Sequence, residues 1–149
     1  MKMMNFDFRY VEQFLVALAL TSLTVIAHSA GMNLARRYFR RSYSSEKDRK
    51  HPGAYRMVMI GIVAIMMATH AFEVVIWTAY YVLRGIVPNA MSAMNFSINS
   101  YTTLGASYIT LPDHWRGLGA FESMAGMLMF GWSTAVLAAV VVKLHSLDA

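Results

Sequence analysis

The stretch Ser100-Tyr101-Thr102-Thr103-Leu104-Gly105-Ala106-Ser107-Tyr108 lies between two long apolar runs and is the feature from which we infer the architecture. The eighteen residues 88–105 include eight Asn, Ser or Thr side chains, namely Asn89, Ser92, Asn95, Ser97, Asn99, Ser100, Thr102 and Thr103. Non-helical backbone is tolerated at membrane depth only where protein buries it or where it lines a water-filled cavity. We therefore expect a polar hairpin that dips into the membrane between two spanning helices. An ordinary loop outside the membrane is the alternative.

The composition is that of a small integral membrane protein. Of the 149 residues, 57% are hydrophobic and only 14% are charged. The apolar blocks are long enough to cross a hydrocarbon core of about 30 Å, for which a helix needs about 20 residues. The chain has no cysteine, which excludes disulfides and thiolate metal sites. Its 13 methionines are more typical of helix packing than of copper ligands.

Three apolar blocks predict transmembrane helices at about Val11–Leu34, Ala54–Leu83 and Gly117–Val142. Between the second and the third, Asn89 is a suitable cap for a short helix that ends near Tyr101. The chain after this short helix has to leave the helical conformation in order to return to the surface. The expected fold is therefore an all-α membrane protein.

The basic residues are concentrated in one segment. Eight of the 13 Lys and Arg residues lie between Arg36 and Arg56. Such a cluster beside a membrane helix indicates a cytoplasmic loop that contacts anionic lipid headgroups rather than nucleic acid. This orientation places the N-terminus outside and the C-terminus in the cytoplasm. We divide the chain into residues 1–53, a transmembrane helix with a basic cytoplasmic loop, and residues 54–149, a pore module.

The predicted second and third spans contain three acidic or histidine side chains, which are costly in a membrane unless paired or hydrated. His70 and Glu73 are three residues apart and share one helix face. Glu122 is the only acid in the third span. A structural hydrogen-bond network is the first interpretation, and ion, proton or metal handling are the alternatives. We expect this intramembrane polar network to join Glu122 to His70, Glu73 or the polar face of the short helix at Asn95 and Asn99.

Two further groups are interpreted as interfacial. His28 is the only strongly polar side chain in the core of the first span. We expect a satisfied histidine near the cytoplasmic interface, with a proton-sensitive contact as the alternative. Trp77, Tyr80 and Tyr81 near the end of the second span fit an aromatic belt at the outer interface.

At Tyr101-Thr102-Thr103-Leu104-Gly105 the sequence resembles the pore signature of tetrameric potassium channels, TTVGYGD or TTLGYGD. Leu111-Pro112 and Trp115-Arg116 resemble the LP and WR of small bacterial channels with two transmembrane helices and a pore loop, and residues 125–135 resemble their pore-lining helix. His70-Ala71-Phe72-Glu73 and Trp77 are similar to the outer helix of a short three-helix bacterial subgroup, the two pore domain potassium channel family. The likeness covers about residues 56–143.

The resemblance implies three transmembrane helices with a re-entrant pore helix and a filter-like loop, assembled as a homotetrameric cation channel of the bacterial inner membrane. It implies a gating hinge at Gly126, and Gly131 is a second candidate on the same helix. It implies no enzyme chemistry. Monovalent cations in the pore, K⁺ or Na⁺, are the only bound groups that we expect.

The filter-like segment departs from the family pattern after Gly105. The expected ion pathway is formed by Thr102, Thr103, Leu104, Gly105, Ala106, Ser107 and Tyr108. In such filters rings of backbone carbonyls replace the hydration shell of the ion. Turning successive carbonyls toward one axis requires φ > 0, which glycine adopts at little cost and serine or tyrosine does not. Because Ala106, Ser107 and Tyr108 replace the tyrosine, the second glycine and the acid of the pattern, we expect weak selectivity for potassium.

Two other functions remain open. A non-conducting regulatory or assembly protein on a channel scaffold would account for the altered filter. A metal- or proton-handling protein would use His70, Glu73, Glu122 and the pair Asp113-His114. Di-metal carboxylate sites need Glu-x-x-His on two helices, whereas this chain has His-x-x-Glu once.

Overall fold

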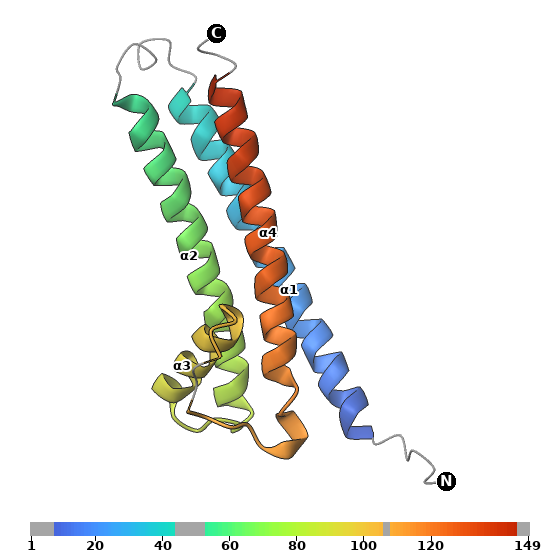
Figure 1. Cartoon of the computed structure of the whole chain (residues 1–149). Coiled ribbons are helices and arrows are strands. Elements are labelled where there is room, and N and C mark those ends of the chain that lie inside the picture. The colour runs from blue at the N-terminus through green and yellow to red at the C-terminus, as the bar shows by residue number, and fades with distance from the viewer. Residues whose placement is uncertain (1–7, 44–52, 106–107, 146–149) are drawn as a thin grey trace. The chain divides into compact units, whose positions relative to one another are not determined.

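The computed structural model describes residues 8–43, 53–105 and 108–145. Within these residues the chain is helical and contains no strand (Figure 1). The elements in order are α1 (Phe8–Tyr43), α2 (Ala54–Leu83), α3 (Ala90–Tyr101), the 3-10 helix η2 (Asp113–Trp115) and α4 (Leu118–His145). The predicted all-α class is confirmed.

Three of these helices are long and apolar enough to cross a membrane. The candidate spans are Tyr10–Ser42, Tyr55–Leu83 and Asp113–Leu144. Since a helix rises about 1.5 Å per residue, each exceeds the thickness of a hydrocarbon core. The prediction of three membrane-spanning helices in an integral membrane protein is therefore supported by the structure.

The first helix is longer than its sequence pattern predicted. α1 continues to Tyr43, through the arginines that we assigned to the loop after Leu34. Ala35 and Phe39 are buried and extend the packed face of the helix at helical spacing. Arginine also has a high helix propensity. The buried face at Ala35 and Phe39, together with the helix-forming arginines, thus explains why the helix continues beyond Leu34.

The described chain divides into two compact units. The first unit consists of Met1–Val25 and Val74–Met127, and the second unit of Ile26–Glu73 and Leu128–Ala149. Each unit therefore draws on parts of α1, α2 and α4, and α3 belongs to the first unit alone. The division into residues 1–53 and a pore module of residues 54–149 stays a prediction.

The core of the first unit is rich in aromatic rings. Tyr81 and Phe96 meet edge to face with ring centroids 5.2 Å apart, which fixes α3 against α2 (Figure 1). The interpretation of Trp77 and Tyr81 as an interfacial belt is wrong, because both are fully buried beneath α3 and the chain around it. The buried residues of this core are Ala17, Leu20, Trp77, Tyr81, Ile86, Val87, Ala93, Phe96, Leu111, Trp115, Leu118 and Ala125.

The core of the second unit is aliphatic apart from Phe39. A close approach of α1 and α2 occurs at Gly31, where an ideal Cβ atom would lie 2.1 Å from the Thr69 hydroxyl oxygen. A small residue is therefore required at this contact. The buried residues of this core are Met32, Ala35, Phe39, Val58, Ile62, Met66, Val136, Val140 and Leu144.

Candidate functional site

The short helix α3 begins at the cap that the sequence indicates. Asn89 has an extended backbone, and its side-chain oxygen accepts a hydrogen bond from the Ser92 amide at 3.0 Å. This bond satisfies one of the amides that lack a partner at a helix start. The helix then runs to Tyr101, as predicted, and the described residues from Thr102 to Leu111 are not helical.

The end of α3 is a turn with two residues in the left-handed region. Thr103 has φ +59° and Gly105 has φ +67°. The Gly105 amide donates to the Asn99 carbonyl at 3.3 Å, which folds the segment back onto the last turn of α3. Glycine adopts this conformation freely, whereas for a residue with a Cβ atom it costs roughly 1–2 kcal/mol. Backbone strain is therefore stored at Thr103, inside the predicted ion pathway.

The filter-like segment is accessible in the single chain. Thr102, Thr103, Leu104, Gly105 and Tyr108 are all exposed. The side chain of Leu104 is 70% exposed although it is aliphatic. Ala106 and Ser107, which carry much of the departure from the channel pattern, lie outside the described residues.

Glu122, which lies on α4, connects α3 to α2 and α4 within the first unit. Its carboxyl group, which is fully buried, accepts a hydrogen bond from the Tyr81 hydroxyl of α2 at 2.8 Å. It also contacts the Ser97 hydroxyl of α3, which lies 3.1 Å from the Val74 carbonyl oxygen. A buried carboxyl group needs such partners to offset its desolvation. Glu122 therefore holds α2, α3 and α4 together at one point.

The prediction that Glu122 contacts Asn95 or Asn99 of α3 is wrong. Asn99 donates its side-chain amide to the Asn95 carbonyl of its own helix at 2.7 Å, and Asn95 is exposed. Ser97 lies between Asn95 and Asn99 in the sequence, and it is Ser97 that is buried and faces Glu122. His70 and Glu73 belong to the second unit.

The two glycines proposed as hinges have different surroundings. An ideal Cβ atom on Gly126 would lie 2.1 Å from the Tyr101 carbonyl oxygen, whereas one on Gly131 meets no atom within 4 Å. Three residues before Gly126, the Ser123 hydroxyl donates to the Ser100 carbonyl at 2.6 Å. Gly126 thus lets the last turn of α3 lie directly on α4. The hinge role of either glycine stays a prediction.

The second unit contains a buried cluster of four polar side chains from three helices. Glu73 of α2 places its Oε1 atom 2.8 Å from Nδ1 of His28 on α1, which is a hydrogen-bond distance. Its other oxygen, Oε2, lies 3.3 Å from Nδ1 of His70. The Nε2 atoms of both histidines face the Ser133 hydroxyl of α4, at 3.0 Å from His70 and 3.4 Å from His28. All four side chains are buried.

The cluster is enclosed by aromatic and thioether groups. The His28 ring lies 5.1 Å from the Trp132 ring, and the His70 ring lies 4.5 Å from the Phe130 ring, between centroids. The sulfur of Met32 lies 3.8 Å from the Ser133 oxygen. These neighbours provide a low-dielectric surrounding, in which polar interactions are strong and unsatisfied groups are costly.

His28, His70 and Glu73 are also the set that could surround a metal ion, with one donor atom from each lying within 4.8 Å of the others. The distances divide between the two interpretations, because the 3.3 Å between His70 and Glu73 matches the spacing of two metal ligands and the distance between His28 and Glu73 does not. The 2.8 Å between His28 and Glu73 is a hydrogen-bond distance. Two ligands of a tetrahedral zinc ion, each about 2.0–2.1 Å from the metal, would stand about 3.3 Å apart.

His28 is satisfied, as expected, but by a buried partner inside the protein rather than at an interface. Ser133 was not identified from the sequence. His28 is fully buried and paired with Glu73, 45 residues further along the chain. A signal was present, because Thr24, His28 and Met32 recur every four residues and all are buried on α1. No local pattern marks Ser133.

Asp113 and His114 do not join either cluster. Asp113 pairs with Arg116 at 2.6 Å, and His114 lies 3.0 Å from the Glu12 carboxylate. The His114 carbonyl also accepts from the Gln13 amide. The contacts of Glu12 and Gln13 with His114 tie the start of α1 to η2 within the first unit.

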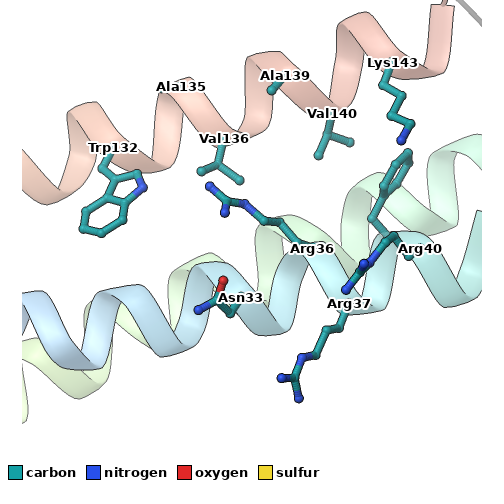
Figure 2. A pocket seen from close by; sticks show the side chains of 11 residues that line it. Asn33, Arg36, Arg37, Arg40, Trp132, Ala135, Val136, Ala139, Val140 and Lys143 are labelled. Atoms are coloured by element: carbon teal, nitrogen blue, oxygen red, sulfur yellow. The ribbon is translucent and has the colours of Figure 1, made fainter.

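A groove lies between α1 and α4 in the second unit (Figure 2). It has a volume of about 650 Å³, an apolar wall on α4 and a basic end. Figure 2 shows Arg36 extending toward Val136, whereas Arg37 extends away from α4. The lining residues are Asn33, Arg36, Arg37, Phe39, Arg40, Trp132, Ala135, Val136, Ala139, Val140 and Lys143.

No protein-family model matches this chain, and no curated protein or solved structure is significantly similar to it.

Proposed function

We propose that this chain is the subunit of a channel-like cation pore, in which α3 re-enters the membrane and residues Thr102–Tyr108 line the ion pathway. The observation that carries this proposal is the position of the end of α3 along α2 and α4. The last turn of α3 packs on Gly126, eight residues after the start of α4 at Leu118. On α2, Ser97 contacts Val74, nine residues before the end of that helix at Leu83.

In a membrane that α2 and α4 span, these positions would correspond to a deep entry of α3. At about 1.5 Å per residue, eight and nine residues are about 12 and 14 Å of helix. A hydrocarbon core is about 30 Å thick, so the end of α3 would reach nearly to its middle. Polar backbone at that depth has to be buried or to line water.

The electrostatics of α3 favour a cation. The carboxyl end of a helix carries a partial negative charge of about half an elementary charge. The exposed turn Thr102–Gly105 continues directly from that end. In a homotetramer, four such helix ends and four turns would surround one axis, with hydroxyl and carbonyl oxygens as the groups nearest to the ion.

The likeness to small bacterial potassium channels supports the same proposal, with the expectation of weak selectivity. The segment that follows Gly105 lacks the second glycine of the channel pattern. We place the protein in the inner membrane with its basic residues in the cytoplasm. The groove between α1 and α4 fits an anionic phospholipid as partner, since arginines lie at one end and apolar residues along the wall.

Current measurements on the purified protein in planar bilayers test the function. We expect cation currents with a low ratio of potassium to sodium permeability. Replacing Gly105 by Ala should abolish or strongly reduce them, because a residue with a Cβ atom is strained at φ +67°. Gly53→Ala is the matched control, since it adds the same methyl group in open space at a glycine without a positive φ.

Two results would contradict this proposal. A strongly potassium-selective current would contradict the weakened filter. Folded protein that assembles but carries no current would favour the non-conducting scaffold instead.

A further inference from the structure

Three side chains of the metal-ligating type meet at one buried point of the second unit. His28 comes from α1, whereas His70 and Glu73 come from α2. One donor atom from each lies within 4.8 Å of the other two, and all three side chains are buried. Two imidazoles and one carboxylate are a ligand set of divalent first-row metals, zinc among them. The histidine of α1 thus supplies the ligand that the single His-x-x-Glu pair of α2 lacks.

Both histidines turn the same ring nitrogen toward the carboxylate. Nδ1 of His28 lies 2.8 Å from Oε1 of Glu73, and Nδ1 of His70 lies 3.3 Å from Oε2. The two imidazole rings are 5.3 Å apart between centroids. An ion placed among these atoms has two nitrogen and two oxygen donors, and four donors is the coordination number of most structural zinc sites.

The other nitrogen of each histidine faces Ser133 of α4. The Ser133 oxygen lies 3.0 Å from Nε2 of His70 and 3.4 Å from Nε2 of His28. A histidine that binds a metal through one nitrogen almost always donates the N–H of the other, which fixes the ring. A hydroxyl oxygen has two lone pairs, so Ser133 can accept from both rings while its own O–H points to the Met32 sulfur, 3.8 Å away. With a metal on both Nδ1 atoms, each of these contacts joins a donor to an acceptor.

One contact of the cluster has to lengthen when an ion binds. The 3.3 Å between His70 and Glu73 already equals the separation of about 3.3 Å between two ligands of a tetrahedral zinc ion. The 2.8 Å between His28 and Glu73 is a hydrogen-bond distance, at which a proton lies between the two atoms. An ion has to displace that proton and open this contact by about 0.5 Å, so binding should release a proton.

We propose that His28, His70 and Glu73 bind one divalent first-row transition metal ion, with Ser133 as the outer hydrogen-bond partner of both histidines. Zn²⁺ is the probe for this class, because nitrogen and oxygen donors without a thiolate suit it. The ion joins α1 to α2 directly and α4 through Ser133, and its binding stabilises the packing of these helices within the second unit.

The metal site does not depend on the proposed pore. Residues Thr102–Gly105 and Tyr108 of the expected ion pathway belong to the first unit, whereas all four residues of the cluster belong to the second. A chain that carries no current can therefore still bind the metal, and a conducting chain can lack it.

Zinc binding by the purified full chain tests the site. Protein without a histidine tag, in detergent micelles, is equilibrated with Zn²⁺ against a chelator of known affinity, and the bound metal is counted by plasma mass spectrometry. We expect one tightly bound ion per chain, an unfolding temperature that rises with Zn²⁺, and proton release in weakly buffered solution. X-ray absorption at the zinc edge should show imidazole nitrogen and carboxylate oxygen ligands at about 2.0–2.2 Å.

Matched variants separate this site from zinc bound at the surface. Ser133→Ala keeps all three ligands and should weaken zinc binding by roughly 10–100-fold, as loss of an outer hydrogen-bond partner does. His28→Gln removes a ligand and should weaken it further. His114→Gln removes a histidine that pairs with Glu12 outside the cluster, and should keep the parental affinity.

The parental chain alone can overturn the proposal, so the test does not require every variant to fold. A parental chain without stoichiometric zinc would contradict it, as would an absorption spectrum without imidazole ligands. Zinc binding that His114→Gln weakens and folded His28→Gln does not would show a surface ion only.

Discussion

Glu122 is the residue on which the position of α3 depends most. Its carboxyl group bonds to hydroxyls from two different helices while being fully buried. A typical intramolecular hydrogen bond contributes about 0.5–1.5 kcal/mol, and a buried donor that is left without its acceptor costs about 1–3 kcal/mol. Removing its acceptor capacity should therefore loosen α3 on both sides at once.

We expect Glu122→Gln to lower the stability of the protein by about 1–3 kcal/mol, because the amide nitrogen cannot accept from a hydroxyl. Thermal unfolding and the tetramer fraction in detergent would both report this loss. The matched control is Glu12→Gln, because the exposed ion pairs of Glu12 contribute little. Equal stability and equal assembly of the two variants would show that Glu122 does not hold α3.

At the scale of elements, the contact between α3 and α4 decides whether the filter-like turn is presented at a fixed place. Gly126 gives α4 a surface without a side chain, against which the backbone at Tyr101 rests. A methyl group there meets backbone atoms, which cannot rotate away as a flexible side chain can.

Gly126→Ala should displace the last turn of α3 and reduce both assembly and current. Gly131→Ala should be neutral or stabilising by up to about 1 kcal/mol, since alanine is the better helix former. Size-exclusion chromatography with thermal unfolding measures both effects. Equal losses in the two variants would favour a shared hinge role over the packing role that we assign to Gly126.

The individual elements were easier to predict than their contacts. The length of the apolar blocks predicted the three spans. Asn89 and the polar residues after it predicted α3 with its correct ends. The pairing of His70 with Glu73 followed from helical spacing. The arrival of His28 and Ser133 at the same cluster depends on packing between helices distant in sequence, which no local pattern encodes.

At the scale of the whole molecule, the proposed pore requires several chains to assemble around one axis. A single chain exposes the strained turn after α3 and the aliphatic side chain of Leu104. Four copies around one axis would bury these groups against each other. Such an assembly is closed and has cyclic symmetry. The convergence of these turns is the central claim.

Cross-linking tests it directly, because the chain has no cysteine of its own. A Leu104→Cys variant in native membranes should form covalent dimers with an oxidant, since a disulfide requires Cα atoms within about 7 Å of each other. The control Leu18→Cys lies at an exposed position of α1, outside the proposed pore module, and should remain monomeric. Efficient cross-linking at position 104 alone is the result that we predict. Its absence in folded protein, also with a short bis-maleimide, would contradict the convergence of these turns.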